Sequence, residues 1–209
     1  MKYILLCLIL GLSSRPDMMP VGMVSVRVEI GVKLRFYNSP FENMPSKSVE
    51  MIFDSSTHSI AIKDRHLSVD WLLPEDLSLD HAVFYLSCMD QKVGWLQVVV
   101  NEQTGKMLWL KEDANLHYLT WADFFKQMFA IDRADPAANP IFTKPDTHSK
   151  QIYYTGNDFF AVRQIHGDWM EIYSPLMADS AHGVSHRISS GWIRWRDDRK
   201  LMIGYYGKD

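Results

Sequence analysis

Short segments in which hydrophobic and polar residues alternate recur along most of the chain. The clearest runs from Val24 to Ile30, and strict alternation of this kind is typical of a half-buried β-strand. Further strands are expected at 59–63, 82–86, 95–100, 107–110, 151–155, 159–163, 169–173, 191–195 and 201–206. Many short strands with little helix predict an all-β fold built from small barrels.

One segment follows a helical period instead. Thr120 followed by Asp123 forms a capping box, which indicates the start of a helix near 120–131. The prolines in 135–140 then predict a linker. Four large apolar residues fall on one face of this helix: Trp121, Phe124, Phe125 and Met128. We expect this face to pack on a neighbouring barrel.

The first twenty residues have the character of a signal peptide. Lys2 gives a positive start, residues 3–12 are an apolar run, and Ser13 and Ser14 follow. The run is too short to span a bilayer but fits the core of a signal peptide, with a buried N-terminal strand as the alternative. We therefore expect residues 1–20 to be a signal peptide and the protein to be exported, periplasmic or extracellular. Cys88 is then the only cysteine left, so packing rather than a disulfide must hold the fold together.

Composition narrows the class of protein without naming a function. The chain has 209 residues, of which 47% are hydrophobic and 22% are charged, as in a protein that buries a core. Its net charge of -3 gives no strongly basic surface, so nucleic acid is not an expected partner. Seven Trp, nine Tyr and ten Phe are many for this length, and aromatic side chains become the main clue.

The two halves of the chain repeat a short aromatic pattern. Each half has an aromatic residue before a proline, then a Trp-x-x-[Val/Ile] strand, a turn, and Trp-[Leu/Ile]-[Lys/Arg]. The matched segments are 36–40 with 142–145, 95–98 with 169–172, and 109–111 with 192–194. A small barrel has a small core, so a few large aromatic side chains must supply much of its buried area.

This order of motifs resembles the bacterial SH3-like (SH3b) domain. The second half fits best, with Gly167-Asp-Trp169 and Gly191-Trp192-Ile193, whereas the first half has an insertion around Trp71 and no Gly directly before Trp109. The resemblance implies two small SH3-like barrels joined by a short α-helix. The boundaries expected are 24–112 for the first barrel, 113–134 for the helix and linker, and 135–209 for the second barrel.

The resemblance also implies a groove lined by aromatic side chains that dock peptides or glycans. The candidate ligand-binding residues are Tyr153, Tyr154, Trp195, Tyr205 and Tyr206. The tryptophans of the repeated motifs, Trp95, Trp109, Trp169 and Trp192, are assigned to the cores. The hypothesis is a non-catalytic exported binding module, without a cofactor, for cell-wall peptide or glycan or for a protein partner. The alternative is a structural or assembly protein of the bacterial cell envelope, whose aromatic surface joins other envelope proteins.

Three other features point to chemistry more weakly. Cys88 would be the nucleophile of a cysteine-dependent wall hydrolase, but it ends a strand instead of starting a helix, where the dipole would favour thiolate. His182 and His186 have the spacing of metal ligands only in a helix, and Gly183 favours a loop, so no metal is expected. A basic cluster near the C-terminus is offset by Asp197 and Asp198, which favours a solvated hairpin over a site for an acidic glycan or nucleic acid. Its members are Arg187, Arg194, Arg196, Arg199 and Lys200.

Overall fold

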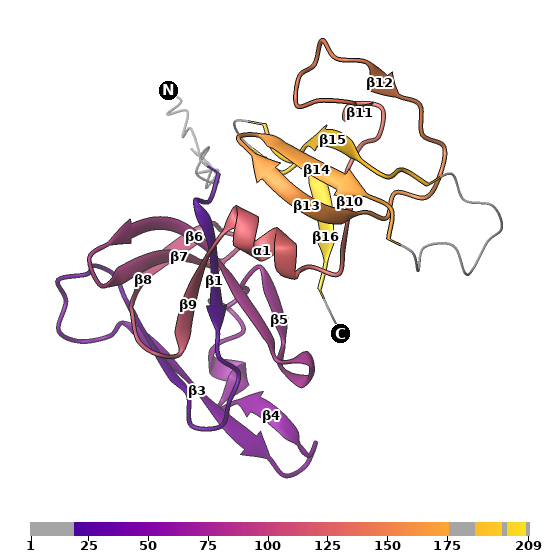
Figure 1. Ribbon diagram of the computed structural model, residues 1–209. Coiled ribbons are helices and arrows are strands. Elements are labelled where there is room, and N and C mark those ends of the chain that lie inside the picture. Colours follow the sequence, from indigo (N-terminus) through magenta and orange to yellow (C-terminus); the bar gives the residue numbers. More distant parts are fainter. Residues whose placement is uncertain (1–18, 176–186, 198–199, 208–209) are drawn as a thin grey trace, which may run out of the picture.

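The computed structural model describes residues 19–175, 187–197 and 200–207, and within them the protein is mostly β-strand (Figure 1). The predicted all-β class is confirmed. Residues 1–18, the pair His182 and His186, and Arg199 lie outside the described residues. The first sheet comprises β1 (Gly22–Val26), β2 (Lys33–Tyr37), β3 (Lys47–Asp54), β4 (Ser59–Ile62), β5 (Asp76–Ser78), β6 (Val83–Lys92), β7 (Trp95–Asn101), β8 (Lys106–Lys111) and β9 (Leu116–Thr120). After α1 (Trp121–Gln127) come β10 (Ala130–Arg133), β11 (Ile141–Phe142), β12 (Gln151–Ile152), β13 (Ala161–His166), β14 (Trp169–Tyr173), β15 (Gly191–Arg194) and β16 (Ile203–Tyr206).

The first sheet curls around its own core and forms what we call the first unit, residues 22–120 (Figure 1). Its strand order is β4-β3-β2-β8-β7-β6-β1-β9, and β5 pairs with β6. Alternate residues of these strands point inward, as their sequence pattern predicts. Val24, Phe36, Leu86 and Val98 are fully buried in this core.

The second unit, residues 130–206, repeats that strand order. Its main sheet runs β12-β11-β15-β14-β13, and β10 pairs with β16. A bridge between Ile131 and Phe160, just before β13, links the two sheets. The path β12-β11-β15-β14-β13-β10-β16 therefore matches β3-β2-β8-β7-β6-β1-β9 of the first unit strand for strand.

The two units agree at the level of single residue pairs. Trp109 pairs with Gln97, and Trp192 pairs with Glu171, in each case two residues after the first Trp of the preceding strand. A β-bulge interrupts the hairpin β6–β7 at Met89 and the hairpin β13–β14 at Arg163, which is the same position in both ladders. The sequence repeat is thus a repeat of strand pairing.

The register corrects the sequence alignment by one residue. Tyr37 pairs with Trp109, and Phe142 pairs with Trp192, so Phe142 corresponds to Tyr37 and not to Phe36. Pro40 and Pro145 then lie three residues after their aromatic partners in both units.

The first unit also contains a segment with no counterpart in the second. Between β3 and β6 the chain forms β4, a short 3₁₀ helix at Arg65–Leu67, β5, and a second 3₁₀ helix at Leu79–His81. Trp71 and Leu72, which the sequence marks as an insertion, are buried in the first core. The ring of Trp71 meets that of Phe36 edge-on at 5.3 Å. The insertion therefore adds hydrophobic packing to the first core.

The helix α1 begins where the sequence predicts. The Thr120 hydroxyl accepts the Asp123 N–H at 3.2 Å and donates to the Asp123 carboxylate at 2.7 Å, so Thr120 is the N-cap that the sequence predicts. The helix is shorter than expected, because β10 starts at Ala130 and fixes the chain against β16. Likewise β9 pairs with β1, so the first sheet extends to Thr120, beyond the expected boundary at 112.

The apolar face of α1 joins the two units. Trp121, Phe124 and Phe125 are at most 7% exposed and belong to a second core that includes residues of both units. Met23 and Leu119 of the first unit contribute to this core. The helix therefore lies between the units (Figure 1). Its apolar face packs against neighbouring strands, as its sequence pattern predicts.

Candidate functional site

The structure distributes the five aromatic candidates over different environments. Tyr153 is 92% exposed and Tyr206 is 49% exposed. Tyr154 is half-buried, with its hydroxyl donating to the Asn157 carbonyl at 2.8 Å. Tyr205 and Tyr206 are consecutive on β16 and so face opposite sides of the sheet. These side chains do not form one groove.

Trp195 belongs to the core and not to the surface. Its side chain is 3% exposed, and its ring packs against Trp121 at 5.7 Å and Phe125 at 5.6 Å. The indole N–H donates to the Gly167 carbonyl at 2.9 Å. Because both its ring and its N–H are occupied inside the protein, Trp195 has no face for a ligand. The expectation that it lines a groove is corrected here.

The expectation that the motif tryptophans lie in the cores holds for burial only at Trp109, and none of the four belongs to either hydrophobic core cluster. Trp109 is buried, whereas Trp95, Trp169 and Trp192 are half-buried. Tyr37 meets Trp95 edge-on at 5.1 Å, and Phe142 meets Trp169 edge-on at 5.5 Å. The same aromatic pair therefore recurs at the same place in each unit.

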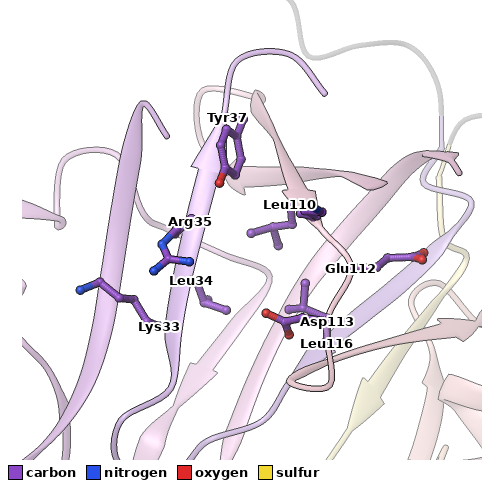
Figure 2. Close-up of a pocket in the computed structure, with 9 residues that line it drawn as sticks. Lys33, Leu34, Arg35, Tyr37, Leu110, Glu112, Asp113 and Leu116 are labelled. Carbon is purple, nitrogen blue, oxygen red and sulfur yellow. The ribbon is translucent and has the colours of Figure 1, made fainter. Parts of the chain in front are cut away.

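A pocket of about 260 Å³ opens beside β2 in the first unit (Figure 2), and we call it the β2 pocket. The ladder between β2 and β8 contains two residue pairs, Phe36 with Leu110 and Tyr37 with Trp109. From Arg35 back to Lys33, β2 is no longer paired with β8, and the pocket lies between this part of β2 and the residues that follow Leu110. It is lined by Lys33, Leu34, Arg35, Tyr37, Leu110, Lys111, Glu112, Asp113 and Leu116.

The walls of the β2 pocket carry charges of both signs over an apolar floor. Lys33 and Arg35 come from the exposed side of β2, and Glu112 and Asp113 come from the loop after β8 (Figure 2). Asp113 fixes this loop, because its carboxylate accepts the Asn115 N–H at 2.7 Å. A ligand with both a carboxylate and an ammonium group would find a partner on each wall.

In the second unit a side chain fills the corresponding gap. Asn139 takes the place of Leu34, and Arg194 takes the place of Lys111, once Phe142 is aligned with Tyr37. The Asn139 amide donates to the Arg194 carbonyl at 2.7 Å and accepts the Arg194 N–H at 3.1 Å. Asn139 and Leu34 are both 2% exposed, but only the Asn139 amide hydrogen-bonds across to the neighbouring strand, and the pocket lies beside Leu34.

Sequence reasoning missed the β2 pocket because the residues of its walls look like an ordinary solvated strand and turn. A signal existed in the repeat. When Tyr37 is aligned with Phe142, the buried Leu34 of the first unit corresponds to Asn139 of the second. The same position therefore holds an apolar side chain in one unit and an amide in the other. That difference marks the position at which the two units diverge.

Cys88 lies in surroundings that suppress nucleophilic chemistry. Its side chain is fully buried on β6, and its thiol donates to the Asp90 carbonyl at 3.6 Å. Burial raises the pKa of the Cys88 thiol to about 12, and the nearby Asp90 and Glu112 carboxylates act in the same direction. Such a thiol stays protonated at neutral pH and has no access to a substrate.

Two further clusters of charged side chains are buried or partly buried and make hydrogen bonds within the second unit. Arg133 forms a bidentate pair with Asp158 at 2.7 Å for each contact. Glu171 is buried and accepts hydrogen bonds from Ser190 at 2.6 Å and from Gln164 at 2.8 Å. Among residues 19–175, 187–197 and 200–207, no group of three or more His, Cys, Asp or Glu side chains is placed to hold a metal ion.

Comparison with known proteins finds no match to any protein family, curated protein or solved structure. In the part of the chain that the structure describes, no helix has the length and apolar character needed to cross a membrane.

Proposed function

We propose that this protein is an exported, non-catalytic binding module of two SH3-like barrels, similar to SH3b domains, that recognises cell-wall peptide or glycan through the β2 pocket. The observation that carries the proposal is the contrast between the units. In the second, Asn139 fills the gap beside the strand, whereas in the first the equivalent gap is a pocket of about 260 Å³.

The way Asn139 is held indicates the chemistry of the ligand. Its amide donates to the backbone carbonyl and accepts from the backbone N–H of a single strand residue, Arg194, and a ligand amide can make the same pair of bonds with the N–H and carbonyl of Lys111 in the first unit. Peptides and N-acetylated sugars both supply amides. The charged walls favour the peptide, because Arg35 suits a carboxylate and Asp113 suits an ammonium group, whereas Lys33 is already paired with Glu50 at 3.4 Å.

The buried thiol supports a binding role over the cysteine-hydrolase alternative. The Cys88 side chain is fully buried in the core of the first unit, and burial raises the pKa of its thiol to about 12. A wall hydrolase of that type needs an exposed thiolate beside a base.

A structural or assembly role in the envelope is the second candidate function. The loop between β2 and β3 carries Phe41, 88% exposed, and Met44, 80% exposed. Exposed apolar side chains on one loop are typical of contact with another protein. This role predicts a defined complex with an envelope protein and no dependence on the β2 pocket.

The test is retention on purified insoluble peptidoglycan of the chain from Arg15 onward, at two salt concentrations. Arg35→Glu reverses one charge of the pocket wall, and Lys150→Glu makes the same change at an exposed site in the second unit. We expect Arg35→Glu to weaken retention at least about tenfold, the scale of one lost charge-assisted contact, and Lys150→Glu to leave it unchanged.

Competition with soluble fragments separates the two ligand sources. Free stem peptide should displace the bound protein, whereas glycan strands without peptide should not. Equal retention of Arg35→Glu, Lys150→Glu and the unaltered chain would refute a role for the β2 pocket.

A further inference from the structure

Phe159 and Tyr206 flank β10, Tyr206 on the face that it shares with its ladder partner Ala130, and Phe129 lies just before β10 with its ring against Phe159; we call these three residues the aromatic patch. Phe129 and Tyr206 are 50% and 49% exposed. The rings of Phe129 and Phe159 meet edge-on at 5.4 Å, and the Phe129 N–H donates to the Tyr206 carbonyl at 2.8 Å. The Tyr206 hydroxyl donates to Asp132 at 2.7 Å, which fixes its ring along this face.

The repeat shows which residues of the first unit correspond to the patch. Val24 pairs with both Leu86 and Tyr118, and Ile131 pairs with both Phe160 and Tyr205. Counting one residue along each strand from these positions, Phe159 corresponds to Tyr85, and Tyr206 to Leu119. The pair Ala130 with Tyr206 matches the pair Met23 with Leu119.

In the first unit a helix covers this face. Met23 and Leu119 are at most 2% exposed and lie in one core with Phe124 and Phe125 of α1. Tyr85 meets the ring of Phe124 edge-on at 5.2 Å. The outer face of the ladder between β1 and β9 is therefore a docking surface for an amphipathic helix with an aromatic stripe.

We propose that the aromatic patch of the second unit docks an amphipathic α-helix of a partner protein, one that presents aromatic side chains at the one, four and five spacing of α1. The argument is that the same face in the same chain is already covered by such a helix. The patch has the aromatic content for this contact, because Phe159 replaces Tyr85 and Tyr206 replaces Leu119. This surface is on the second unit, so the proposal is independent of the β2 pocket on the first.

The probe is a helix-stabilised peptide with the sequence of residues 119–129, which carries the stripe of Trp121, Phe124 and Phe125. Added to the protein from Arg15 onward, it should shift the backbone amide resonances of the aromatic patch and of its neighbours on β10 and β16. Phe129→Ser with Tyr206→Ser should weaken binding at least about tenfold, because each ring contributes buried apolar area. The peptide with Phe124→Ala and Phe125→Ala should not bind.

The matched control is Tyr153→Ser, which removes an exposed aromatic ring of the same unit outside the patch and should leave peptide binding unchanged. Phe129→Tyr, which retains the ring, should bind like the unaltered protein, and unchanged amide resonances of the Ser variant outside the patch show that its loss of binding is not misfolding. Absence of shifts at the patch would overturn the proposal. So would self-association or binding to anionic lipid vesicles that the patch variant abolishes while the peptide has no effect.

Discussion

The hydroxyl of Tyr205 on β16 donates a hydrogen bond to the carboxylate of Glu75, 130 residues earlier in the chain. Glu75 lies in the insertion of the first unit, so this bond crosses directly from the second unit to the first. The Tyr205 ring also meets Phe124 of α1 edge-on at 5.0 Å. One side chain thus contacts the second unit, the helix and the first unit.

Tyr205→Phe should cost about 1 kcal/mol of unfolding free energy, because it deletes a hydrogen bond to a partly exposed charge and keeps the ring packing. Urea denaturation measures the loss, with Tyr153→Phe at an exposed position as the control. Burial and the Glu75 carboxylate raise the pKa of Tyr205 above its ordinary value of 10.0. The contribution of the neutral hydroxyl is therefore present below about pH 10 and decreases as the pH rises above it.

Absorbance titration checks the same point independently. The unaltered protein and Tyr205→Phe should show the same tyrosinate signal up to about pH 11, since Tyr205 does not ionise there while the protein is folded. If the tyrosinate signal of Tyr205→Phe near pH 10 is smaller than that of the unaltered protein by one tyrosine, Tyr205 ionises at its ordinary pKa and the hydrogen bond to Glu75 does not keep it protonated.

Asn139→Ala should destabilise the protein by about 2 to 3 kcal/mol. The change leaves the Arg194 N–H and carbonyl without their buried partner and also removes the Met202 carbonyl's contact at 3.3 Å. Thermal and urea denaturation measure the effect, and Asn43→Ala in an exposed loop is the control. A loss as small as that of Asn43→Ala would show that the amide does not close the second unit.

Glu171→Gln should destabilise the protein in a pH-dependent way. Hydrogen bonds from Ser190, Gln164 and Arg163 lower the pKa of Glu171 below its ordinary value of 4.5, although burial opposes them. The ionised carboxylate therefore stabilises the fold above about pH 4.5, and this contribution is lost as the pH falls through the lowered pKa. The difference in unfolding free energy between the two proteins should shrink between pH 6 and pH 3, whereas a constant difference would contradict the assignment.

Cys88 should not react with a disulfide reagent at about pH 8 in the folded protein, because the buried thiol with a pKa raised to about 12 stays protonated. In the chain from Arg15 onward, one thiol should become reactive in denaturing urea. Ser55→Cys, at an exposed position, supplies a thiol that reacts at once in the folded state. Fast reaction of Cys88 itself without denaturant would reopen the nucleophile hypothesis.

Much of the local structure was predictable from the sequence because its signals are local. Alternation within 24–30 marks β1, and the spacing of Trp121, Phe124 and Phe125 marks the buried face of α1. The capping box at Thr120 needs only a side chain and an N–H three residues apart. The motifs that begin at Trp95 and Trp169 marked the repeat, since these tryptophans hold the same place in the β6–β7 and β13–β14 hairpins and are half-buried in both units.

The candidate site was not predictable in the same way, because it depends on pairing between distant strands. Trp195 looked like a surface aromatic, and only the position of α1 over it makes it a core residue. β9 was expected to be linker, and its partner β1 lies at the other end of the first unit. The one-residue correction from Phe36 to Tyr37 also came from pairing with Trp109.

Sequence patterns alone thus predict the all-β class, the helix with its buried face, and the repeat. The places where the two repeats differ come from the folded chain: a pocket beside β2 where the second unit has the Asn139 amide, and an aromatic patch where the first unit has a helix. Periodicity fixes which side of a strand turns inward, because that depends on neighbours two residues away. Which residues cover a given face of the sheet depends on how strands far apart in the sequence pair and pack, so the exposed surfaces follow from the tertiary structure.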